Sequence, residues 1–130
     1  MKTLHTVTAV IEAGAGLALG CSPSAVVALL LGTGLDTSAA VVLGRLAGAA
    51  LLALGVACWL ARGDAESRAA RGLVAAMLLY NLAAVALLAF AGVGLGLHGV
   101  AWWPAVILHA AMTVWCLAAL NRGKGQAVPH

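Results

Sequence analysis

Four polar side chains lie inside long apolar segments of this 130-residue sequence: Glu12, Arg45, Asn81 and His109. A carboxyl group and an imidazole exchange protons, an amide orients both by hydrogen bonds, and an arginine neutralises a carboxylate. Inside a bilayer an unpaired charge is costly, so such groups are expected to pair, to face water or to act on a ligand. These residue types therefore suggest proton binding, or recognition of a polar group, within a membrane.

The depths of these four residues can be compared along the helices that must carry them. At about 1.5 Å per residue, Glu12 and Asn81 lie roughly 14 Å from the ends of their spans, His109 roughly 17 Å and Arg45 roughly 24 Å. Three polar groups from three helices thus share one level. The long Arg45 side chain can reach toward them, and we expect Glu12 and Arg45 to interact, directly or through a bridging side chain or water.

Glu12 leaves three interpretations open. It can belong to a polar clasp that fixes the order of the helices, bind a proton or a ligand, or face an oligomer interface. His109 alone is also typical of a satisfied interior histidine, and Tyr80 and Asn81 can simply bridge helices.

The elements that position these residues follow from composition. Hydrophobic residues make up 64% of the sequence, charged residues 8%, and the mean hydropathy is +1.07. These values are typical of an integral membrane protein, and the net charge of +3 gives no indication of nucleic-acid binding. We expect one domain over residues 1–130.

Apolar length and turn residues predict an all-α transmembrane four-helix bundle. After the first span, Ser22 and Pro23 start a run too short to cross a bilayer, which predicts a short interfacial or re-entrant helix over residues 23–31. The sequence 36–38 is expected to cap the second span, and the glycine-rich stretch 91–99 to form a bend. The predicted spans cover residues 3–20, 38–61, 73–91 and 103–120.

Small residues at four-residue spacing favour close helix packing in lipid. Gly16 and Gly20 in the first span, and Gly44 and Gly48 in the second, are therefore expected to line helix contacts.

The basic residues outside the spans predict the topology, because with four spans these six residues fall on one side. We expect both termini in the cytoplasm and the protein in a bacterial inner membrane. Trp102 and Trp103 then lie at the opposite interface, where they and the short helix would roof a pocket floored by the polar residues. The basic residues are Lys2, Arg62, Arg68, Arg71, Arg122 and Lys124.

Several kinds of site lack support in the sequence. His5, His98 and His109 lie at three different depths, which disfavours a bis-histidine haem. The cysteines show no metal-ligand spacing and are expected to be buried apolar side chains, and no nucleotide-binding or hydrolase motif occurs. We therefore assign no catalytic residue and no metal, and the sequence leaves the cofactor unknown.

The pattern resembles the small four-helix membrane proteins of the DoxX-like group. The resemblance rests on Cys21-Ser22-Pro23 followed by the short apolar run, and on a second helix that contains GRLAGAALLALG. Members of that group are largely uncharacterised, and those named for DoxX are associated with quinone-linked sulfur oxidation complexes. The resemblance implies a functional role for Arg45.

Three hypotheses follow. The first is binding of a lipid, quinone or other amphiphile, or an accessory role in a membrane complex. The second is a proton-coupled small transporter or channel-like oligomer. The third, a membrane enzyme with His109 and Glu12 as acid and base, has least support because no nucleophile or cofactor motif accompanies them. Expected partners are the bilayer, a hydrophobic small molecule, and further copies or subunits. The candidate ligand-binding or proton-relay residues are Glu12, Arg45, Tyr80, Asn81, Trp102, Trp103 and His109.

Overall fold

The computed structural model of the protein describes the backbone of residues 1–124 and the side chains of residues 1–122. Within this part of the chain there are five α-helices and no strand, which confirms the predicted all-helical class. Four of the helices are long and apolar enough to cross a membrane. The helices are α1 (Lys2–Cys21), α2 (Pro23–Leu31), α3 (Ser38–Ala61), α4 (Arg68–Ala89) and α5 (Trp102–Lys124), with a 3₁₀ turn at Arg62–Asp64 and a π-helical turn at Phe90–Gly94.

Local side-chain chemistry sets several helix ends. The Thr37 hydroxyl accepts a hydrogen bond from the Ala40 amide at 3.1 Å and caps α3, as the sequence predicts. Ser67 caps α4 in the same way, with its hydroxyl 3.1 Å from the Ala70 amide. Helix α4 therefore begins at Arg68, five residues before the predicted third span, which starts at residue 73.

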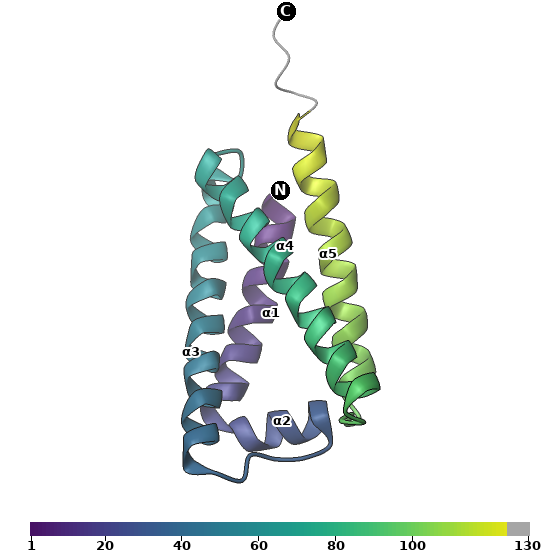
Figure 1. Cartoon of the computed structure of the whole chain (residues 1–130). Coiled ribbons are helices and arrows are strands. Elements are labelled where there is room, and N and C mark those ends of the chain that lie inside the picture. The colour runs from purple at the N-terminus through teal and green to yellow at the C-terminus, as the bar shows by residue number, and fades with distance from the viewer. Residues whose placement is uncertain (125–130) are drawn as a thin grey trace, which may run out of the picture.

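The long helices form two pairs. Helix α1 packs antiparallel along α3, and α4 packs antiparallel along α5 (Figure 1). Figure 1 also shows the two pairs lying close together near the N-terminus and spreading apart toward α2. The arrangement of the pairs decides which residues can share a site.

Helices α1 and α3 approach closely because glycine removes side chains from their interface. A methyl group on Gly48 would lie 2.6 Å from the Gly20 nitrogen, and one on Gly16 would lie 2.6 Å from the Leu52 nitrogen. Gly55, which the spacing argument did not select, would meet Ala13 in the same way at 2.8 Å. A side chain on Gly20 itself would point into open space, so this glycine only offers its backbone to Gly48.

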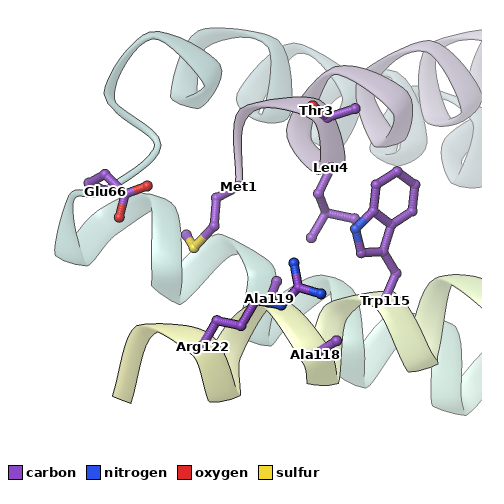
Figure 2. Close-up of a pocket in the computed structure, with 8 residues that line it drawn as sticks. All are labelled: Met1, Thr3, Leu4, Glu66, Trp115, Ala118, Ala119 and Arg122. Atoms are coloured by element: carbon purple, nitrogen blue, oxygen red, sulfur yellow. The ribbon is translucent and has the colours of Figure 1, made fainter. Parts of the chain in front are cut away.

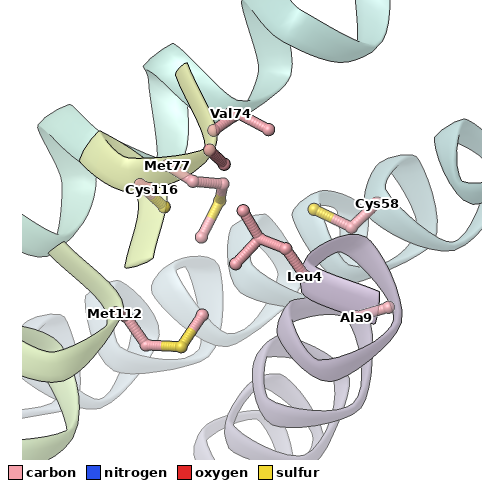
Figure 3. Packing of buried hydrophobic residues seen from close by; sticks show 8 residues of the cluster. Leu4, Ala9, Cys58, Val74, Met77, Met112 and Cys116 are labelled. Carbon is pink, nitrogen blue, oxygen red and sulfur yellow. The ribbon is translucent and has the colours of Figure 1, made fainter. Parts of the chain in front are cut away.

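The buried hydrophobic cluster joins the two pairs in the half of the molecule near the N-terminus (Figure 3). All four long helices contribute side chains to it, so this is where the pairs are held together. The cluster consists of Leu4, Ala9, Cys58, Val74, Met77, Met112, Cys116 and Ala119.

Helix α2 joins the pairs at the opposite end. It lies across the bottom of Figure 1, and its last carbonyls accept backbone hydrogen bonds from the loop before α5. The Gly99 amide donates to Leu30 and the Ala101 amide donates to Leu29, each at 2.9 Å. A side chain on Gly99 would collide with the Leu29 carbonyl, so this close approach requires glycine. The bonds satisfy carbonyl groups that a helix end otherwise leaves unpaired.

Candidate functional site

One face of α1 carries a row of buried polar side chains. His5, Thr8 and Glu12 are each only 2–3% exposed, and their spacing of three and four residues places them on a single stripe. The row begins near the N-terminal end of the helix and ends at Glu12, near its middle. Sequence reasoning selected Glu12 but not Thr8, although the position of Thr8 four residues before Glu12 was the available signal.

His5 ties α1 to α4 through the backbone. Its Nε2 lies 3.3 Å from the Ala70 carbonyl oxygen, and its Nδ1 lies 3.0 Å from the Met1 carbonyl oxygen. A carbonyl oxygen can only accept a hydrogen bond. Only a ring protonated at both nitrogens makes both bonds at once, whereas a neutral ring keeps one of them.

Only 3% of Glu12 is exposed, and no hydrogen bond or ion pair within residues 1–122 reaches its carboxyl group. No side-chain nitrogen or oxygen in this part of the chain is both fully buried and unpaired, so the carboxyl oxygens of Glu12 keep a small accessible surface. Cys58 on α3 and Tyr80 on α4 lie close enough for its charge to act on the thiol and on the hydroxyl. Glu12 therefore lies between the two helix pairs.

Asn81 and His109 form a direct hydrogen bond between α4 and α5. The Asn81 amide nitrogen donates to the Met77 carbonyl at 2.7 Å, so the amide oxygen is the atom that faces His109. His109 Nδ1 lies 2.8 Å from that oxygen and must carry the proton that it donates. In a neutral ring, Nε2 then keeps a free lone pair, since the protein assigns the tautomer through Asn81.

Tyr80 completes the group at mid-helix. Its ring meets the His109 ring edge to face, with centroids 5.6 Å apart. The structure therefore brings together four of the residues that the sequence selects, from three helices: Glu12, Tyr80, Asn81 and His109. We refer to these four residues as the polar core. It offers a carboxyl group, a phenol and an imidazole nitrogen at one level.

Arg45 does not join the polar core. It is exposed on α3, and within the described residues no ion pair reaches it. Its neighbour Gly44 faces Pro23, whereas Glu12 lies level with Gly55, which packs against Ala9 and Ala13. Ten residues along α3 separate these levels by about 15 Å. The expected contact between Glu12 and Arg45 is therefore absent from the described structure.

The two tryptophans that the sequence groups together differ in environment. Trp102 is 8% exposed and donates a hydrogen bond from its ring nitrogen to the Leu88 carbonyl at 2.9 Å. Its ring occupies the space that a side chain at Gly92 would need. Trp103 is 65% exposed on the outer surface. The two rings meet edge to face with centroids 4.7 Å apart.

The three cysteines differ in environment. Cys58 and Cys116 are buried thiols in the hydrophobic cluster, as expected, whereas Cys21 is exposed, so the expectation that it is buried is wrong. None of the three forms a disulfide. Among the residues that the structure describes, no group of three His, Cys, Asp or Glu side chains is placed to hold a metal ion.

Among the residues that the structure describes, a groove and a pocket stand out, and neither is lined by the polar core. A shallow apolar groove of about 280 Å³ lies on the α1/α3 pair beside Val10 and Trp59. A larger pocket of about 450 Å³ lies between the start of α1, the turn before α4 and the end of α5 (Figure 2). Its lining residues are Met1, Thr3, Leu4, Glu66, Trp115, Ala118, Ala119 and Arg122.

No family model, curated protein or solved structure matches this chain.

Proposed function

We propose that the protein is a bacterial inner-membrane protein that binds an amphiphilic molecule, such as a lipid or a quinone, through its polar core. The observation that carries this proposal is Glu12, a mid-helix residue that is only 3% exposed and whose carboxyl group makes no hydrogen bond or ion pair within residues 1–122. Its oxygens keep a small accessible surface through which a ligand can reach them. Ionisable residues inside transmembrane segments are rare and generally mark functional sites. A ligand that supplies the missing hydrogen bonds would give this carboxyl group a role.

The carboxyl group of Glu12, the phenol of Tyr80 and the imidazole of His109 favour a ligand whose polar end carries two oxygen atoms. A carboxyl group accepts hydrogen bonds when ionised and donates one when protonated, a phenol does both, and the free nitrogen of His109 accepts. A quinol presents two hydroxyl groups to such acceptors, and a quinone presents two carbonyls to the donors. Apolar ring substituents or acyl chains suit the surrounding helices.

An accessory role in a larger membrane complex is part of the same proposal. It follows the resemblance to the DoxX-like group, in which the members named for DoxX are associated with quinone-linked complexes. We further propose that both termini face the cytoplasm and that α2 lies at the opposite interface, because this orientation collects the basic residues on the cytoplasmic side.

Direct titration tests the binding proposal. The purified protein in mild detergent would be titrated with a short-chain benzoquinone and with its quinol, and binding measured by calorimetry. Glu12→Gln and His109→Phe each weaken or remove a hydrogen bond between the polar core and the probe. Each variant should therefore bind the probes about tenfold more weakly. Asp36→Asn, an exposed acid-to-amide change remote from the core, should bind normally. Undetectable binding of both probes, and no lipid or quinone in organic extracts of the purified protein, would contradict the proposal.

A proton-coupled transporter is the second candidate, and the buried row of His5, Thr8 and Glu12 favours it. These side chains lead from the N-terminal end of α1 to the polar core and could carry a proton to Glu12. Proteoliposomes with an internal pH dye test this function. Proton entry that disappears in Glu12→Gln would support it, and entry no faster than in protein-free vesicles would count against it.

A further inference from the structure

The 450 Å³ pocket at the basic end of the molecule has a lining unlike that of the polar core. Its wall is partly apolar, with Leu4, Ala118 and Ala119, and carries two charged side chains of opposite sign, Glu66 and Arg122. Its volume lies within the roughly 300–1,000 Å³ of ordinary ligand sites. The pocket is therefore large enough to take a small polar group together with some hydrocarbon.

The pocket lies at the ends of α1 and α5, two helices long and apolar enough to span a membrane, so lipid headgroups are expected beside it. Arg122 is near the end of α5, and Trp115 lies seven residues earlier, about 10 Å deeper into the span. Tryptophan is enriched at this depth because its ring is apolar and its nitrogen is polar. A ligand in this pocket would hold its charges at the surface and its apolar part beside Trp115.

The two charges lie apart from each other in the pocket. Figure 2 shows Glu66 on the side of the turn before α4, with the Met1 side chain between it and the Arg122 guanidinium, which lies toward Leu4 and Trp115. No ion pair joins Glu66 to Arg122 within residues 1–122, and both side chains are exposed. Each charge is therefore accessible to a ligand.

We propose that this pocket binds the phosphoethanolamine headgroup of a phospholipid. The phosphate would accept hydrogen bonds from the Arg122 guanidinium, whose planar fork suits phosphate oxygens. The ammonium group would donate to the Glu66 carboxylate, and the glycerol and first methylenes would lie against Trp115. A choline headgroup cannot donate a hydrogen bond to Glu66, and a glycerol headgroup offers it no positive charge. The charge pattern therefore selects phosphatidylethanolamine over both.

Lipid competition measures this selectivity. The protein in detergent would be exposed to phosphatidylethanolamine, phosphatidylcholine and phosphatidylglycerol with identical acyl chains, and bound lipid counted by native mass spectrometry. The ion pair between the lipid ammonium group and Glu66 would be partly exposed, and pairs of this kind contribute little free energy. Phosphatidylethanolamine should therefore bind about threefold to fivefold more tightly than phosphatidylcholine. Equal binding of the three lipids by the unaltered protein would overturn the proposal.

Two variants separate the roles of the charges. Glu66→Gln should remove the preference for phosphatidylethanolamine over phosphatidylglycerol, while Arg122→Gln should weaken both lipids. Asp64→Asn and Arg68→Gln are the matched controls, since each removes a charge of the same sign at the same end of the molecule. Neither residue lines the pocket, so both variants should keep the preference for phosphatidylethanolamine. A preference that survives Glu66→Gln would refute the assignment.

A soluble headgroup tests whether the ligand is a lipid. Free phosphoethanolamine should compete only weakly, because it lacks the apolar part that lies beside Trp115. Full competition at equal concentration would assign the pocket to a soluble metabolite and overturn the lipid proposal.

Discussion

The α1/α3 pair and the α4/α5 pair are held together by different means. Between α1 and α3, Gly16, Gly48 and Gly55 let the two backbones come into contact. Between α4 and α5, side chains make the connection, through the bond of Asn81 to His109 and that of Trp102 to Leu88. In lipid, close packing and interhelical hydrogen bonds are the main sources of helix association, and this molecule separates the two. The first pair should therefore be sensitive to added volume, and the second to lost polarity.

The largest expected effect is that of added volume at Gly48. Gly48→Ala places a methyl group against the Gly20 backbone and should lower the free energy of unfolding by about 1–3 kcal/mol. Gly20→Ala adds the same group on the same interface but in open space, and should be neutral or slightly stabilising because alanine favours helices. Thermal unfolding in detergent compares the two. Equal melting temperatures would show that the interface between α1 and α3 tolerates a methyl group at position 48. The first pair would then not be the one that is sensitive to added volume.

A smaller effect is expected from the polar contact of the second pair. A double-mutant cycle of Asn81→Leu and His109→Phe should give a coupling energy of about 0.6–1.7 kcal/mol, the range found for hydrogen bonds between transmembrane helices. The same cycle run with Trp103→Leu in place of Asn81→Leu is the control, since Trp103 is exposed and remote from the bond. Zero coupling between Asn81 and His109 would mean that packing alone holds this pair together.

The smallest expected effect is the coupling between Glu12 and Arg45. Because about 15 Å separates their levels along α3, the losses from Glu12→Gln and Arg45→Met should add to within about 0.5 kcal/mol. Urea or detergent unfolding of the two single variants and the double variant measures this sum. A coupling above that limit would indicate a conformation that brings Arg45 to the polar core.

The predictable part of the site was the depth of its residues, and the unpredictable part was the direction in which each points. Depth depends only on position along a helix, so Glu12, Asn81 and His109 could be placed at one level from the sequence. Direction depends on which face packs against a neighbour. Gly44 and Gly48 occupy the packed face of α3, and Arg45 lies about 100° around the helix from Gly44, on the exposed side.

The helices, like the site, were predictable only in part from the sequence. Apolar length predicted four spanning segments, and a capping threonine predicted the start of α3. The start of α4 was missed by five residues, because hydropathy does not distinguish a helical turn rich in arginine and alanine from a loop. Ser22 and Pro23 were expected to start the short helix, and Pro23 does begin α2 at its first position, whereas the Ser22 side chain makes no capping bond. The glycine-rich stretch predicted as a bend contains a π-helical turn at Phe90–Gly94.

The short turn between Arg62 and Ser67 has a consequence for biosynthesis. It is the link between the two pairs along the chain, so every residue of the glycine-lined pair precedes it. Chains emerge from the ribosome N-terminal end first, and early units fold before later ones appear. Helices α1 and α3 can thus associate while α4 and α5 are still being made, and the completed first pair then serves as the surface onto which the second pair docks.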